Sequence, residues 1–189
     1  MEIRHATNPV DVQRLNTTEL RERFLIENLF EAEKINMVYS HHDRMIVGGA
    51  SPINEKLELA DAETLKTEYF LERREVGFIN IGGPAIIEAD GESYELLKLD
   101  ALYVGKGTKQ VLISSKDAAN PAKVYFTSAL AHATFPTTKI ELEKATPNHL
   151  GSKETCNERT IYQYIHEGAV QSCQLMLGVT LLKDGSIWN

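Results

Sequence analysis

The feature that most constrains the fold is the dipeptide Asp90-Gly91, which lies between two strand-like runs. The residues before it read Pro-Ala-Ile-Ile-Glu-Ala, and those after it read Glu-Ser-Tyr-Glu-Leu-Leu. A two-residue hairpin of type I′ needs positive φ at both central residues, a conformation that Asp and Gly tolerate. The pair therefore predicts a tight antiparallel hairpin and favours a mainly β protein.

Turn signals recur about every 8–12 residues, which is typical of an antiparallel sandwich or barrel. No long helical period separates the strand-like runs, so a parallel βαβ sheet is disfavoured. One amphipathic helix is predicted near the N-terminus, at residues 17–28, and a polar stretch at 151–158 indicates a linker. Strands are predicted at 35–39, 44–47, 57–59, 69–72 continuing at 75–81, 101–104, 110–114, 123–128, 159–164 and 173–182.

The charge balance excludes several classes of partner. The formal net charge is −7, whereas nucleic-acid binding and anionic membrane surfaces need clustered Lys and Arg. No apolar run approaches the roughly 20 residues that span a bilayer, and no apolar leader begins the chain. Cys156 and Cys173 lack the spacing of a redox motif and are too few for a disulfide framework. We therefore expect a soluble, cytoplasmic protein with reduced thiols.

Part of a two-part metal signature is visible, and it resembles that of the small β-barrels called cupins. The first part reads H-x-H, three or four spacers, E, six spacers, G, and the second reads P-x-G, two spacers, H. With three spacers, Glu75 occupies the carboxylate position, and the imidazole positions fall on Tyr69, Leu71 and Gln110. Alternate strand residues share a face, so the motif needs imidazoles at both ends of H-x-H. We predict a cupin-type antiparallel sandwich or barrel, a jelly roll, without a metal site.

A more specific resemblance covers nearly the whole chain. A series of segments, in order, resembles the 5-keto-4-deoxyuronate isomerase family: MVYSHHDRMIVGG (37–49), YFLERREVGFINIGG (69–83), DALYVGKG (100–107), PAK (121–123), AHATFPTTK (131–139), RTI (159–161) and CQLMLGVTLLKDGSIWN (173–189). The resemblance implies a bicupin ketol-isomerase of pectin and uronate breakdown that acts on a small sugar acid. It also implies a homohexamer, and zinc held by the second cupin.

The resemblance also implies a division of the chain. Residues 1–150 are expected to form a metal-free cupin with an N-terminal helix. Residues 151–189 are expected to hold a linker and the first strands of a second, truncated cupin. The family's metal-ligand stretch follows the segment that matches residues 173–189. We therefore expect zinc only in the complete protein, and no isomerase activity from these 189 residues alone. The alternative hypothesis is a noncatalytic structural, assembly or sugar-acid-binding cupin module.

Few residues qualify as functional candidates. Arg73 and Arg74 are candidates for binding a substrate carboxylate, because guanidinium groups pair with carboxylates in a fork. The alternative is a salt bridge to a neighbouring glutamate or to another subunit. Trp188 is a candidate wall residue of a substrate site, with a core position as the alternative. His41 and His42 are adjacent, so on a strand they face opposite sides and cannot chelate one ion together. No catalytic base and no metal ligand is assigned.

Overall fold

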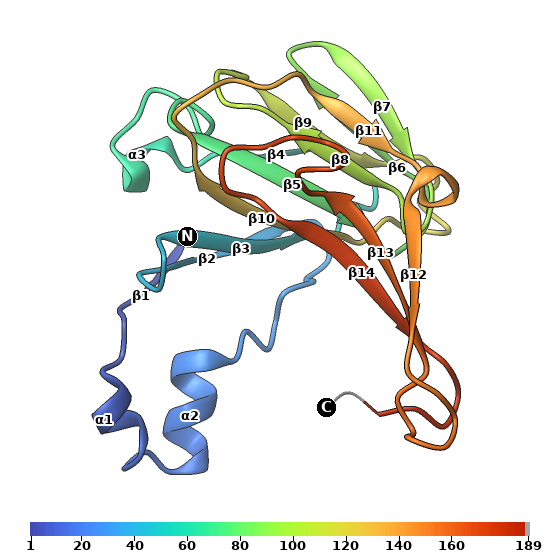
Figure 1. The fold of residues 1–189 in the computed structure, drawn as a ribbon. Helices are drawn as coiled ribbons and strands as arrows, with labels where there is room; N and C mark the ends of the chain where they lie inside the picture. Colours follow the sequence, from blue (N-terminus) through green and yellow to red (C-terminus); the bar gives the residue numbers. More distant parts are fainter. Residues whose placement is uncertain (188–189) are drawn as a thin grey trace.

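Two packed β-layers form the body of the protein (Figure 1). The computed structural model describes residues 1–187. Eight consecutive strands are divided between the layers, with the order β3-β10-β5-β8 in one and β4-β9-β6-β7 in the other. This strand order is that of a jelly roll, so the predicted antiparallel sandwich is confirmed, although its sheets do not close into a barrel. The strands are β3 (Met45–Ala50), β4 (Leu57–Glu58), β5 (Arg74–Asn80), β6 (Ala85–Ala89), β7 (Glu92–Leu96), β8 (Ala101–Val104), β9 (Val111–Ser115) and β10 (Val124–Leu130).

Further elements surround the jelly roll. Two strands extend the first layer beyond β3 and one extends it beyond β8, which makes that sheet seven-stranded. These are β1 (Glu2–Arg4), β2 (Ile35–Ser40) and β11 (Thr138–Ile140). A separate three-stranded sheet contains β12 (Thr146–Leu150), β13 (Arg159–Ile165) and β14 (Leu177–Leu182). The helices are α1 (Pro9–Val12), α2 (Thr17–Phe24), α3 (Ala62–Leu65) and the 3₁₀ helix η1 (Leu142–Lys144).

The main hydrophobic core fills the space between the two jelly-roll layers. Its centre includes Val76, Phe78 and Phe126, all fully buried, and the two phenylalanine rings lie 5.6 Å apart. Such tilted aromatic pairs add to the stabilisation that their buried area provides. Both layers contribute apolar side chains from alternate strand positions, as a half-buried strand requires.

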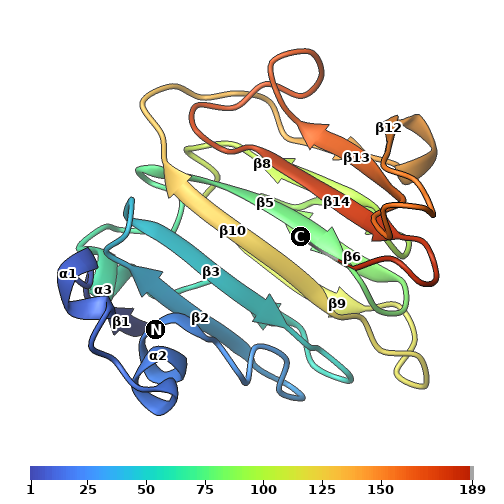
Figure 2. The same cartoon turned by 60° about the horizontal axis from the view of Figure 1, so that its bottom comes forward.

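A second core covers the outer face of the seven-stranded sheet. There Ile79 and Tyr103 pack with Tyr164, Ile165 and Leu175 of the three-stranded sheet and its connection. Figure 2 shows β13 and β14 running across β5 and β8. As a result all seven residues of β5 are buried, because one face of this strand meets each core.

The predicted hairpin is confirmed. Asp90 and Gly91 have φ of 48° and 87° and join β6 to β7, as a type I′ turn requires.

The N-terminal helix is also confirmed, although α2 ends at Phe24. A capping box holds its start, since Asn16 accepts from the Glu19 N–H and the Glu19 carboxylate accepts from the Asn16 N–H. Figure 1 shows α1 and α2 apart from the two layers, and neither helix contains a buried residue.

Three predicted segments differ from the structure, one of them being 173–182, where the strand β14 begins only at Leu177. Residues 69–72 form a turn, in which the Glu72 N–H donates to the Tyr69 carbonyl, so β5 begins only at Arg74. Residues 151–158 contain neither strand nor helix, as a linker predicts. However, β12 precedes this stretch and pairs with β13 across it, with His149 opposite Thr160. The division of the chain at residue 150 therefore stays a prediction, with a hydrogen-bonded sheet bridging it. Within residues 1–187 no helix is long and apolar enough to cross a membrane.

The hairpin supplies a test of the fold. Replacing Gly91 with Ala puts a Cβ on a residue at φ 87°, which costs about 1 kcal/mol in the left-handed region. We expect the free energy of unfolding in urea to fall by about that amount. The matched control is Glu92→Ala, an exposed neighbour with ordinary backbone geometry, which should change stability by less than about 0.5 kcal/mol. Equal stability of the two variants would contradict the assigned turn.

Candidate functional site

The residues at the signature positions do not form a metal centre. Glu75 points away from the jelly-roll interior, and Val76 points into it. The cupin signature allows three or four residues between its second histidine position, here Leu71, and its carboxylate position. With four residues between them, the carboxylate position falls on Val76 and not on Glu75. Leu71 is packed in the core, and Gln110 is exposed. These side chains offer no imidazole or carboxylate inside the jelly roll, so they do not fit a zinc ion. Within residues 1–187 no three His, Cys, Asp or Glu side chains are grouped as a metal site requires.

Glu75 has a different role. Its carboxylate is fully buried and accepts four hydrogen bonds, one from the Tyr103 hydroxyl at 2.7 Å. The other donors are the backbone N–H groups of Cys173 at 2.8 Å, Gln174 at 2.7 Å and Leu175 at 3.0 Å. Burial, and then the bond to Glu75, raise the pKa of the Tyr103 hydroxyl, so it remains a donor. The carboxylate thus ties the connection between β13 and β14 to the jelly roll.

This arrangement predicts a large effect of a small change. Glu75→Gln preserves the volume but turns an amide NH₂ toward N–H donors, so at least one buried donor loses its acceptor. We expect unfolding in urea to require about 3 kcal/mol less. The control Tyr103→Phe removes one of the four donors and should cost about 1 kcal/mol. A Glu75→Gln protein as stable as the parent would show that the carboxylate does not hold the second sheet.

A cavity of about 370 Å³ opens where the first residue of β5 meets the last residue of β10 and the end of β2. We call it the Arg74 cavity. Its floor holds Arg74, which is 2% exposed, while α3 and the segment after it form one side. The lining residues are Ile3, Tyr39, His41, Thr64, Leu65, Thr67, Arg73, Arg74 and Leu130. Five separate chain segments therefore meet there, which no local sequence pattern reveals.

Arg74 is held by neutral oxygen atoms. Its Nε donates to the Ser128 hydroxyl at 3.0 Å, and its Nη2 donates to the backbone carbonyls of Arg44 and Ser128, both at 2.8 Å. The guanidinium carbon lies 5.6 Å from the centre of the Tyr39 ring, a cation–π contact. Burial, partly offset by the Tyr39 side chain and reinforced by the Arg44 cation, lowers the pKa of Arg74 to about 10, so the side chain stays charged at neutral pH.

The functional candidates from the sequence differ in their position relative to the Arg74 cavity. Arg73 and Arg74 both line the cavity, but their environments differ. The Arg73 side chain is 65% exposed and lies 3.5 Å from a Glu72 carboxylate oxygen. His41 lines the same cavity and stacks on His5 with ring centres 4.8 Å apart. Trp188 lies outside the described residues. Ligand binding by the two arginines stays a prediction.

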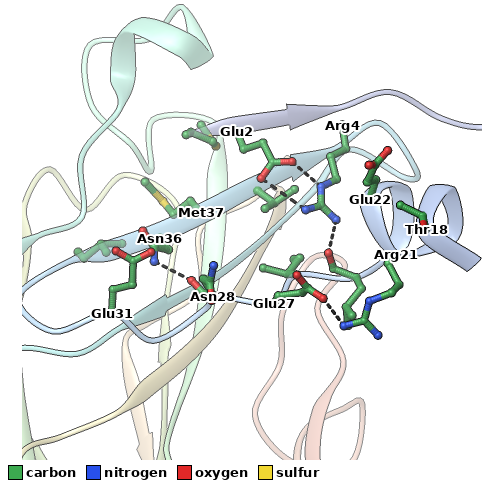
Figure 3. Close-up of a pocket in the computed structure, with 15 residues that line it drawn as sticks. Glu2, Arg4, Thr18, Arg21, Glu22, Glu27, Asn28, Glu31, Asn36 and Met37 are labelled. Carbon is green, nitrogen blue, oxygen red and sulfur yellow. Dashed lines mark hydrogen bonds and ion pairs between the residues drawn. The ribbon is translucent and has the colours of Figure 1, made fainter.

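A second cavity, of about 710 Å³, lies between α2 and strands β1 and β2 (Figure 3). Its arginines are paired. Arg4 contacts the Glu2 carboxylate at 2.6 Å and donates to the Leu25 carbonyl at 2.8 Å, and Arg21 forms an ion pair with Glu27. Figure 3 shows Glu2 beside Arg4 and Glu27 beside Arg21, which leaves these two cations compensated. The Arg74 cavity is therefore the stronger candidate for binding an anion.

These features define an acidic jelly-roll protein with a cavity whose buried Arg74 has no carboxylate partner among residues 1–187. Comparison with known proteins identifies its family. The KduI/IolB family model matches residues 24–189, so the chain belongs to the KduI/IolB family.

Curated relatives cover the whole chain. A protein of Oceanobacillus iheyensis is 57% identical over 190 residues, which is 100% of this chain and 69% of that protein. A protein of Halalkalibacterium halodurans is 52% identical over 100% of this chain and 68% of its own length. Both are named 4-deoxy-L-threo-5-hexosulose-uronate ketol-isomerase, and the resemblance drawn from the sequence is thereby confirmed.

Similar solved structures are more distant. An IolB-like protein from Salmonella typhimurium is 13% identical, with a TM-score of 0.48 over 63% of this chain and 43% of that chain. A cupin protein from Bacteroides fragilis is 16% identical, with a TM-score of 0.36 over 50% of this chain and 72% of that chain.

Proposed function

We propose that the chain belongs to a ketol-isomerase that interconverts 4-deoxy-L-threo-5-hexosulose uronate and 3-deoxy-D-glycero-2,5-hexodiulosonate in pectin and uronate degradation. The observation that carries this proposal is the 57% identity, over all of this chain, to a relative with the corresponding name. The matched region includes both hydrophobic cores, so the relative is expected to share this fold.

The reaction requires chemical groups that we do not assign to the described residues. Ketol isomerisation moves a proton between two adjacent carbons, and it needs a positioned base and stabilisation of the enediolate that forms. The resemblance implies zinc in the complete protein, held by a second cupin. The jelly roll described here does not fit the metal, because Leu71 and Val76 occupy positions where ligands are needed. We therefore assign this jelly roll a noncatalytic part in the enzyme.

We further propose that the complete protein is a cytoplasmic homohexamer. Support comes from apolar side chains that the described residues leave exposed on and beside α2, namely Leu20 at 37%, Phe24 at 47% and Leu25 at 40%. An amphipathic helix that buries nothing against its own chain is suited to packing against another copy.

A fusion protein tests the proposed activity. Residues 1–189 are joined to the part of the Oceanobacillus iheyensis relative that lies outside the matched region, which the resemblance places after residue 189. We expect the fusion to isomerise the hexosulose uronate and to bind zinc. The 189-residue chain should do neither, because its described residues supply no ligand set. The readouts are product formation, metal content by mass spectrometry and molar mass by light scattering.

The controls separate the parts of this proposal. The unfused segment of the relative, assayed alone, reports whether the jelly roll is needed for activity. A folded fusion without isomerase activity would refute the proposed reaction. Stoichiometric zinc in the 189-residue chain would refute the noncatalytic part assigned to its jelly roll.

A further inference from the structure

The Arg74 cavity contains a buried positive charge without a counter-charge. Every hydrogen bond of Arg74 goes to a hydroxyl or a backbone carbonyl, and no carboxylate pairs with it among residues 1–187. Its Nη1 group donates to neither Ser128 nor a backbone carbonyl within the same residues, and the one other hydrogen bond of the guanidinium is to the neutral Tyr39 side chain. Burying an unpaired cation is unfavourable, and removing one partner of a buried ion pair is a large loss. The site therefore contains a buried cation that an anionic ligand could pair with.

The lining of the cavity adds no negative charge beside Arg74. Neither Asp nor Glu is among the residues that line the cavity, although the chain contains 27 of them and carries a net charge of −7. Arg73 also lines the cavity, 65% exposed and 3.5 Å from a Glu72 carboxylate oxygen, so the buried Arg74 guanidinium is the main positive charge that the opening presents to an anion.

Polar and apolar groups complete a pocket for an organic molecule. The Thr67 hydroxyl is buried and has no hydrogen-bond partner, while the Thr64 hydroxyl is occupied by Asp61 at 2.5 Å. Thr67 is thus available to a ligand hydroxyl. Leu65 and Leu130 supply an apolar wall beside the Tyr39 ring. A volume of about 370 Å³ is within the range of small-molecule sites.

We propose that the Arg74 cavity binds a small sugar acid of hexuronate size, with the carboxylate at Nη1 of Arg74 and a hydroxyl at Thr67. A carboxylate oxygen can accept from Nη1, because the Nε and Nη2 hydrogens already donate within the protein, and the carbon backbone of the sugar lies against the apolar wall. The choice of a sugar acid rests on the proposed function, whereas the requirement for an anion comes from the cavity itself.

Calorimetric titration of the 189-residue chain tests the ligand class. The probes are D-galacturonate and D-galactose, which have the same ring but carry a carboxylate or a hydroxymethyl group at C6. We expect one galacturonate to bind per chain, with galactose at least about tenfold weaker. Galacturonate that binds no more tightly than galactose would overturn the proposal. Because no turnover is measured, this result is independent of the isomerase assay.

Variants test the location without relying on Arg74, whose replacement risks the fold. Thr67→Val removes the unpartnered hydroxyl at nearly constant volume. Stability should stay the same or rise, while galacturonate affinity should fall several-fold. Arg73→Gln removes the rim charge and should also weaken binding. The matched control is Arg23→Gln on α2, an exposed arginine that lines neither cavity and should bind like the parent.

If Thr67→Val and Arg73→Gln both bind galacturonate like the Arg23→Gln control, the site lies elsewhere and the proposal is wrong. Thermal unfolding of each variant without ligand accompanies every titration. A loss of affinity counts in favour only when the variant remains folded, as Thr67→Val should.

Discussion

The buried carboxylate of Glu75 is the interaction on which the arrangement of the molecule depends. Four donors converge on it, and three of them are consecutive backbone N–H groups from a segment about 100 residues further along the chain. Burying a carboxylate is costly unless hydrogen-bond donors replace the water that its oxygens lose. The backbone N–H groups of the turn at Cys173–Leu175 in turn need acceptors, which the Glu75 carboxylate provides. The jelly roll and the three-stranded sheet are therefore joined by a polar contact as well as by apolar packing.

Alternate side chains of β5 face the three-stranded sheet and the interior of the jelly roll. Glu75 and Ile79 face the three-stranded sheet, whereas Val76 and Phe78 fill the jelly roll. Arg74 follows the parity of Val76 and reaches the end of the interior, at the opening of the cavity. A position that a metal-binding cupin would give to a ligand is filled here by packing. The polar group of this face is Arg74, at the end of β5 where the interior meets solvent.

Sequence reasoning succeeded where the determinants are local and failed where they are not. Asp90-Gly91 predicted its hairpin because both residues tolerate the φ values that the turn imposes. The assignment of Glu75 to a metal-ligand position was wrong because β5 starts at Arg74 and is buried on both faces, so its sequence lacks the alternation that reveals which face is inside. Arg74 was recognised as a candidate, but Thr67 was not, because its missing partner is a property of the folded chain.

A sugar-acid pocket in this jelly roll, in place of a metal centre, can be observed by crystallography. The crystals would contain the 189-residue chain and be grown with both D-galacturonate and zinc chloride. We expect a carboxylate within hydrogen-bond distance of Arg74 Nη1 and a hydroxyl at Thr67, with the interior around Leu71 and Val76 filled by side chains alone. Zinc coordinated between the two layers, or galacturonate bound only outside the Arg74 cavity, would contradict it.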